Sequence, residues 1–249
     1  MLTAEQIQDQ KTQIIDILRN TGRAEIESLI TFLSDSDFFT APASTKYHGA
    51  YDGGLAEHSL HVWYVLTEKN RYYSLGLSEE AIAITALCHD LCKVGFYQEG
   101  GEPCSKAQYD YLSSLWTQKS GSIKEKPETL LKYLEDGQFK RSVPAAIATI
   151  LIDWLKNKLG EPFPEIPVVY SVKDSFPVGH GEKSVITLLR FIQLTDQEIA
   201  MIRWHMGGYI AKDDYRDLSN AMELYPAIVA LHAADLEASH LIKIGGNEA

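Results

Sequence analysis

The adjacent pair His89–Asp90 is the strongest chemical signal in the chain, because it directly follows the apolar run AIAITALC. Neighbouring residues on an α-helix point about 100° apart, so both side chains reach one site only where a helix end meets a cavity. An imidazole nitrogen and a carboxylate oxygen together suit borderline divalent metal ions. A buried carboxylate without a partner is costly, so the pair predicts further polar ligands elsewhere in the chain.

Two other residues offer suitable ligand atoms in apolar helical surroundings. His58 lies in GGLAEHSLHVW, and Asp235 lies in ALHAADLEAS. Taken singly, His58 could be a core histidine, Asp235 could pair with a nearby base, and His61 shares the helical face of His58. Taken together, these residues and the His89–Asp90 pair predict one metal site.

Apolar periodicity predicts that helices carry these side chains. Ser78 is the expected N-cap of the helix that leads into His89–Asp90. Thr195 and Glu198 form a capping-box pattern for another helix, which we expect to end at Gly207–Gly208. The helix that Ser78 begins is expected over residues 79–93. The remaining expected helices cover residues 3–20, 23–33, 55–74, 182–193 and 226–242.

Residues 100–165 differ in composition from the rest of the chain. Gly, Pro and Lys surround two strings with helical patterns, TLLKYLED and PAAIATILIDWLKNKL. The flanking strings VGFYQ and PVVYSV have the composition of strands. We therefore expect a small antiparallel hairpin with a helical insertion at about residues 101–165. The sequence as a whole predicts an all-α, mainly helical fold, with residues 1–249 forming one domain that has an N-terminal helical extension over residues 1–45.

The composition limits the classes of partner. The 249 residues include 23 Lys and Arg against 34 Asp and Glu, which gives a net charge of -11. This balance argues against binding long duplex nucleic acid, whereas a short phosphorylated ligand is compatible because a bound metal inverts the local field. Three cysteines do not form a disulfide framework and are expected to be small buried side chains. The sequence shows neither a signal peptide nor a run of about 18 apolar residues, so we expect a cytoplasmic protein without a membrane partner.

The strings GGLAEH, ALCHDLCK and HAADLEAS resemble the successive motifs of the HD superfamily of metal-dependent phosphohydrolases. The resemblance covers roughly residues 48–100 and 168–242. It implies an HD-domain helical bundle, and its GGLxEH pattern favours His58 over His61. The metal ligands that it implies are His58, His89, Asp90 and Asp235.

Two further strings extend the resemblance. FPVGHGEKS places His180 just before a helix, and IRWHMGG places His205 at a helix end. Both strings are similar to those of a group of small phage and bacterial HD hydrolases. In HD proteins with two metals, two extra histidines complete a second site, so the resemblance implies that His180 and His205 bind a second ion and that Asp90 bridges. The set is similar to that of HD-type exoribonucleases and HD-GYP phosphodiesterases, although this sequence lacks the glycine-tyrosine-proline motif and an obvious nucleic-acid-binding domain.

The resemblance predicts hydrolysis of a phosphomonoester or phosphodiester bond in a nucleotide, dinucleotide or short oligonucleotide. The expected cofactors are two divalent ions of Mn, Fe, Co, Ni or Zn, with Mg as a further option, and a metal-bound hydroxide would attack phosphorus. Asp90 and Lys93 are the expected catalytic residues, since the family uses the same HDxxK position. Lys93, Lys183 and Arg203 are candidates for substrate binding, and each is alternatively a solvated surface charge.

Two other functions fit the same ligand set: an oxygenase with two irons, and a nucleotide-binding HD protein without catalysis. Lys93 favours hydrolysis over oxygenation. His232 is either a support for the ligands or a core residue, Tyr97 and Tyr209 are candidates for the pocket wall, and His48 and His240 are given no role. The oligomeric state stays open.

Overall fold

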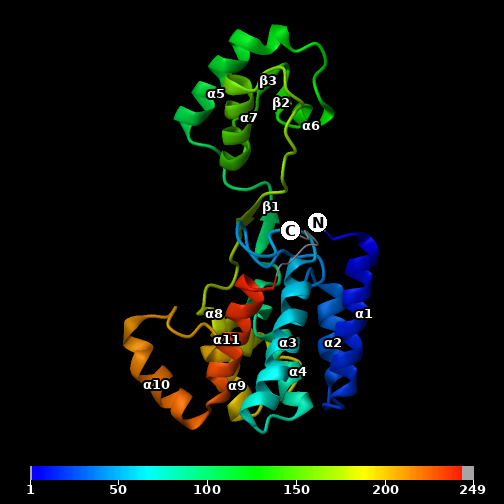
Figure 1. Cartoon of the computed structure of the whole chain (residues 1–249), viewed down its shortest axis with the longest axis vertical. Helices are drawn as coiled ribbons and strands as arrows, with labels where there is room; N and C mark the ends of the chain where they lie inside the picture. The colour runs from blue at the N-terminus through cyan, green and yellow to red at the C-terminus, as the bar shows by residue number, and fades with distance from the viewer. Residues whose placement is uncertain (1, 243–249) are drawn as a thin grey trace. The chain divides into compact units, whose positions relative to one another are not determined.

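The computed structural model describes residues 2–242, which divide into two compact units (Figure 1). The first unit holds the described residues up to Tyr97 and from Lys173 onward, and the second unit spans Gln98–Val172. Within the described residues there are eleven α-helices and two sheets of two strands each. The predicted mainly helical fold class is therefore confirmed.

The helices of the first unit include every helix that was expected there. One further helix, Tyr215–Leu224 (α10), was not expected, although Leu218, Ala221 and Met222 lie at helical spacing in its sequence and pack against the core. The other bounds are Ala4–Asn20 (α1), Ile26–Asp35 (α2), Gly54–Tyr73 (α3), Glu79–Cys88 (α4), His180–Leu188 (α8), Asp196–Trp204 (α9) and Ala227–His240 (α11), with 3-10 turns at Leu91–Lys93 (η1) and Lys212–Asp214 (η3).

The predicted caps are present at the helix starts. The Ser78 side chain accepts a hydrogen bond from the backbone N–H of Ala81, and Thr195 with Glu198 forms the expected capping box. The expected end of α4 near Lys93 was wrong, because the helix stops at Cys88 and Asp90 has φ -100° and ψ 21°. The chain therefore leaves the helix at the His89–Asp90 pair.

The first unit is built around α3, which packs against α4 and α11, and around α8, which packs against α9 and η1 (Figure 1). Two clusters of buried apolar side chains fill these contacts, one with Leu55, Ile84 and Leu188, and the other with Leu66, Met201 and Leu231. Helices that carry the expected ligands therefore share an apolar core.

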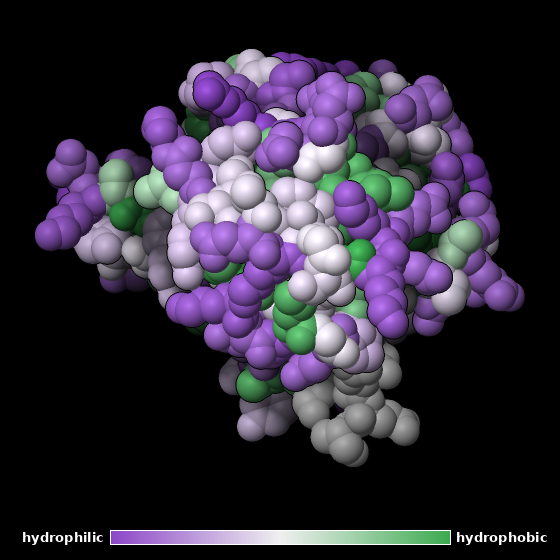
Figure 2. All heavy atoms as spheres, turned by 90° about the horizontal axis from the view of Figure 1, so that it is seen from above, coloured by the Kyte–Doolittle hydropathy of each residue, from purple (hydrophilic) through white to green (hydrophobic). Residues whose placement is uncertain are grey.

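Hydrophilic side chains predominate on the face drawn in Figure 2, where hydrophobic ones form only small separate groups.

The second unit has an apolar core of its own, which includes Trp116, Phe139 and Leu151. The helix α5 was not predicted, although Ser105 with Gln108 forms a capping box that marks its start. The expected helix over TLLKYLED is wrong beyond its first turn, because a tight turn at Asp136–Gly137, both with positive φ, folds the chain into a hairpin. Its elements are Lys106–Lys119 (α5), Ser120–Ser122 (η2), Glu128–Leu131 (α6), Leu134–Glu135 (β2), Gln138–Phe139 (β3) and Ala145–Asn157 (α7).

The strands Tyr97–Glu99 (β1) and Tyr170–Val172 (β4) form the other two-stranded sheet. This pairing was predicted from the strings VGFYQ and PVVYSV, but each strand is only three residues long. The predicted insertion at about residues 101–165 lies inside the second unit. Among residues 2–242, no helix combines the length and the apolar character that crossing a membrane requires.

Candidate metal centre

One continuous cluster brings together all six predicted ligands in the first unit. Among the described residues, three groups of side chains could each hold a metal ion, and the ligand atoms within each group lie within 4.8 Å of one another. The groups overlap at His89 and Asp90, so they form a single site. They are His58, His89 and Asp235; His89, Asp90 and His205; and Asp90, Cys92 and His180.

A close approach of two backbones places His58. A Cβ atom at Gly54 would overlap the carbonyl oxygen of Gly49, so only glycine lets the start of α3 lie against the preceding loop. His58 lies one turn further along α3 and is fully buried. Its Nε2 atom lies 3.1 Å from Asp235 Oδ1 and 3.3 Å from His89 Nε2.

His89 and His205 are oriented by the same local device. Each lies just after the last residue of its helix, α4 or α9, and each ring donates its Nδ1 hydrogen to a carbonyl oxygen three residues earlier, at 2.8 Å to Ala86 and 2.7 Å to Ile202. A ring fixed in this way presents the lone pair of its Nε2 atom, which is the arrangement of metal-ligating histidines. Both Nε2 atoms face Asp90, at 3.4 Å from Oδ2 and 3.6 Å from Oδ1 respectively.

His180 is the first residue of α8, two residues before the expected start of that helix. A Cβ atom on Gly181 would overlap the backbone of Arg203, so glycine lets α8 and α9 lie in close contact. As a result the rings of His180 and His205 have centroids 5.3 Å apart. His180 Nε2 lies 2.7 Å from Asp90 Oδ1.

Asp90 is the charged centre of the cluster. Its side chain is buried, and Lys93 Nζ lies 2.6 Å from Oδ2. Burial alone would raise the pKa of Asp90, but the positive charge of Lys93 and the contacts with histidines hold it well below its ordinary value. Burial would likewise lower the pKa of Lys93, but the charge of Asp90 keeps it above its ordinary value. The two side chains therefore form a buried pair of opposite charges.

The donor atoms fit a metal ion. His205 Nε2 is buried and has no hydrogen-bond partner within the described part of the chain, and Nδ1 of His58 shares this property. Because His205 donates through Nδ1, its Nε2 lone pair faces a carboxylate oxygen with no hydrogen between them, which is unfavourable unless a cation lies there. Imidazole, carboxylate and thiol groups are together the ligands of borderline divalent ions. The cluster could therefore hold a metal ion.

The cluster lies against a pocket of about 820 Å³, and Asp90, His180 and Asp235 form part of its wall. Tyr97 and Tyr209, the predicted wall residues, line it as well. The other lining residues are Ala43, Ser44, Tyr47, His48, Lys93, Met206, His232, Leu236, Ser239 and His240. The candidate ligands and a pocket thus occur together.

Three residues that lie in the cluster or in the pocket wall were not predicted from the sequence to do so. Cys92 was expected only to pack, yet it belongs to one of the ligand groups. His48 and His240 were given no role, yet both line the pocket, and the His48 ring lies 5.0 Å from that of His58. Burial and the nearby charge of His58 lower the pKa of His48 to about 4. The signal in the sequence that could have pointed to His48 was its position shortly before the Gly53–Gly54 pair, at which the helix of His58 begins.

His232 supports the end of α9. Its Nδ1 atom donates to the carbonyl oxygen of His205 at 2.7 Å, and its ring packs where a Cβ on Gly207 would lie. Gly207 itself has φ +55°, a conformation that favours glycine. Of the two roles considered for His232, the structure shows the supporting contact.

Lys183 and Arg203 do not belong to the pocket wall. Lys183 Nζ lies 2.7 Å from Asp174 and 4.9 Å from the centroid of the Phe96 ring. Arg203 lies over the ring of Trp204 and pairs with Glu182 and Asp214. Their predicted contacts with substrate stay predictions, and of the three cations considered only Lys93 lines the pocket.

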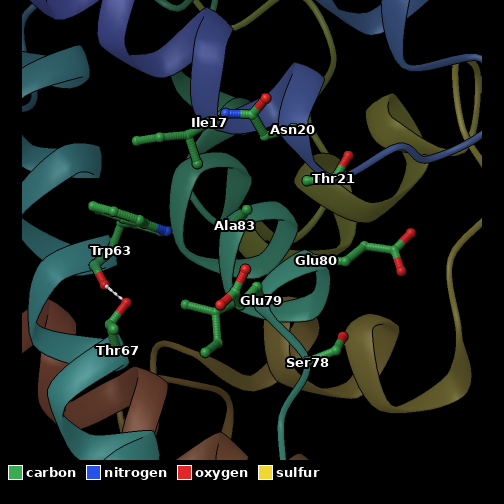
Figure 3. A pocket seen from close by; sticks show the side chains of 10 residues that line it. Ile17, Asn20, Thr21, Trp63, Thr67, Ser78, Glu79, Glu80 and Ala83 are labelled. Carbon is green, nitrogen blue, oxygen red and sulfur yellow. Dashed lines mark hydrogen bonds between the residues drawn. The ribbon is translucent and has the colours of Figure 1, made fainter.

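A second pocket, of about 660 Å³, lies between α1, α3 and the start of α4 (Figure 3). Trp63 and Thr67 line it from α3, and Glu79 and Glu80 from the first turn of α4. Glu80 is already paired with Arg23. No histidine or cysteine is among its lining residues, so it lacks the mixed ligand set of the cluster.

A comparison with known proteins found no matching family model, no matching curated protein and no matching solved structure. The buried cluster of histidines and aspartates on a helical fold is compatible with an HD-type site. The chain's own motifs and the geometry of the cluster therefore provide the evidence about function.

Proposed function

We propose that this protein is a metal-dependent phosphohydrolase of the HD type. Its substrate would be a phosphomonoester or phosphodiester in a nucleotide, a dinucleotide or a short oligonucleotide. The observation that carries the proposal is the ion pair of Lys93 with Asp90, 2.6 Å long, at a pocket whose wall also holds His180 and Asp235. A cation beside metal ligands is what a bound phosphate requires.

The two carboxylate oxygens of Asp90 face different ligands, which supports two metal positions. Oδ2 lies 3.7 Å from His58 Nε2 and 3.4 Å from His89 Nε2, on the side of Asp235. Oδ1 lies 2.7 Å from His180 Nε2 and 3.6 Å from His205 Nε2. In our proposal His58, His89 and Asp235 would hold one ion, His180 and His205 would hold another, and Asp90 would offer an oxygen to each group.

The charges of the pocket wall also suit a phosphate. Among the described residues that line it, the acidic ones are Asp90 and Asp235, which are both proposed ligands. When bound, two divalent ions would neutralise both carboxylates, lower the pKa of a coordinated water and attract phosphate oxygens. This local charge contrasts with the net charge of -11 of the whole chain.

The protein's own contribution is orientation and charge. The backbone carbonyls of Ala86 and Ile202 fix the rings of His89 and His205, so little reorganisation is needed when the site is used. Lys93 keeps its proton because its pKa lies above the ordinary value, so it can donate to a phosphate oxygen as charge develops. The exposed rings of Tyr47 and Tyr209 at the pocket offer surfaces on which a base can stack.

The test is phosphate-bond cleavage by protein first treated with a chelator and then supplied with a single divalent metal. We expect no cleavage of nucleoside monophosphates, dinucleotides or short oligonucleotides before the metal is added, and cleavage of at least one class afterwards. Equal activity in the chelated protein would refute the proposal. Consumption of O₂ by the iron-loaded protein without phosphate release would establish the alternative oxygenase function instead.

A further inference from the structure

Cys92 places a sulfur atom in the ligand group that it forms with Asp90 and His180. Its Sγ atom lies 3.4 Å from both ring nitrogens of His180, and the Cys92, His180 and Asp90 ligand atoms all lie within 4.8 Å of one another. The Cys92 side chain is buried, with 3% exposed. The sulfur and Asp90 Oδ1 therefore both contact the His180 ring.

Two of the spacings around Asp90 and His180 match the edges of a metal coordination shell, while the 2.7 Å from His180 Nε2 to Asp90 Oδ1 is a hydrogen-bond distance. With bonds of about 2.3 Å to sulfur and about 2.0–2.1 Å to nitrogen, tetrahedral ligand atoms lie about 3.5 Å apart. The sulfur lies 3.4 Å from the His180 nitrogens, and His205 Nε2 lies 3.6 Å from Asp90 Oδ1. Independently, the buried Nε2 atom of His205, which lies beside the same Asp90 Oδ1, has no hydrogen-bond partner among residues 2–242.

The backbone holds Cys92 in place. Its N–H donates to Ser184 Oγ at 3.0 Å, which ties η1 to α8, the helix that begins with His180. The two other cysteines lack this setting. Cys88 is buried within α4, where burial raises its pKa to about 12, and Cys104 lies in the second unit.

We propose that Cys92 is a sulfur ligand of the metal position formed by Asp90, His180 and His205. This inference rests on the proposed metal-dependent function and extends it to the choice of metal. As the metal–sulfur bond forms, the thiol proton leaves to solvent. Thiolate ligands favour Zn, Co and Fe(II), whereas Mg and Mn favour sites made of oxygen ligands. This position is therefore selective for the first set of ions.

The test uses Co²⁺ added to the full-length, chelator-stripped protein, with the absorption spectrum and the cobalt content both recorded. A cobalt–thiolate bond gives a charge-transfer band in the near ultraviolet, while cobalt bound by nitrogen and oxygen gives only weak visible bands. We expect the band in the wild type, its loss in Cys92→Ser, and its retention in Cys88→Ser and Cys104→Ser. We also expect Cys92→Ser to keep the cobalt held by His58, His89 and Asp235.

Wild-type protein that binds two cobalt ions without the near-ultraviolet band would overturn the sulfur ligand while leaving the proposed function intact. Retention of the band in Cys92→Ser would overturn it equally. Wild-type protein that binds no cobalt would overturn both proposals, and the measured metal content separates this outcome from the first. If Cys92→Ser fails to fold, the wild-type spectrum together with the spectra of Cys88→Ser and Cys104→Ser still decides the question.

Discussion

His58 and His89 face each other through their Nε2 atoms, which lie 3.3 Å apart in the buried interior. His89 already donates through its Nδ1 atom, so a neutral His89 ring turns a lone pair toward His58. Asp235 Oδ1 lies 3.1 Å from the same His58 nitrogen. The His89 lone pair and the Asp235 carboxylate thus face the same His58 nitrogen, within a group of side chains that could hold a metal ion.

We predict that divalent metal stabilises the folded protein. A ligand present at 100 times its dissociation constant adds about 2.7 kcal/mol to the free energy of unfolding. The midpoint of thermal unfolding should therefore rise when Zn²⁺ or Co²⁺ is added to stripped protein, and this rise should be smaller in His89→Ala, which removes a ligand of one of the two proposed ions. His61→Ala is the matched control, because His61 lies on α3 but in none of the ligand groups. An equal rise in His89→Ala would contradict the assignment.

Replacing Lys93 with Met should impair turnover and spare metal binding. Loss of one donor to a developing negative charge lowers kcat by about 10²–10³-fold. The variant should retain wild-type metal content, because Lys93 supplies no ligand atom. The control is Lys106→Met, since Lys106 forms an ion pair of the same 2.6 Å length with Asp110 on an exposed helix of the second unit. A normal kcat in Lys93→Met would remove this lysine from the mechanism.

Gly181→Ala should separate α8 from α9. The added Cβ would overlap the backbone of Arg203, which cannot yield as a flexible side chain would. We expect a loss of about 1–3 kcal/mol in stability, typical of overpacking, together with weaker binding of the metal held by His180 and His205. Denaturant unfolding and metal titration measure the two effects. Gly208→Ala should be neutral, because a Cβ there meets no atom within 4 Å.

Arg23→Met should destabilise the first unit without touching the site. Arg23 pairs with Glu80 at the start of α4 and with Glu198 in α9, at 2.5 Å, where Glu198 is 1% exposed. Removing the guanidinium leaves that carboxylate buried and unpaired, at a cost of about 3–5 kcal/mol. Arg71→Met, which breaks an exposed pair with Glu68 on α3, should change the unfolding free energy by less than about 1 kcal/mol. Equal effects of the two substitutions would refute this account.

The sequence predicted the helices that carry the ligands from apolar residues at helical spacing and, for α4 and α9, also from distinct caps. Ser78 and Thr195 mark the starts of α4 and α9 because each side chain accepts a hydrogen bond from a backbone N–H in the first turn of its helix. The end of α4 was misplaced because the apolar run continues through Leu91 and Cys92, although the backbone has already left the helix. Periodicity alone does not distinguish an α-helix from a 3-10 turn with the same buried residues.

The ligand set was predictable by residue type, but its neighbours were not. Contacts of Cys92 with His180 and of His48 with Ser239 join residues 88 and 191 positions apart, and only the folded chain brings them together. The interpretation of Lys183 and Arg203 relied on nearness in sequence to His180 and His205. On a helix, neighbours in sequence point in different directions, and here they point to ion pairs.

The pairing of β1 with β4 has a consequence for how this protein can be altered. Paired strands lie about 4.8 Å apart, so the chain leaves and rejoins the first unit at adjacent points. Residues between these strands behave as a cassette that could be shortened to a tight turn or exchanged for another module without cutting a helix that carries a ligand. A chain shortened in this way should keep the ligand cluster of the first unit, because none of the cluster's residues lies between the two strands.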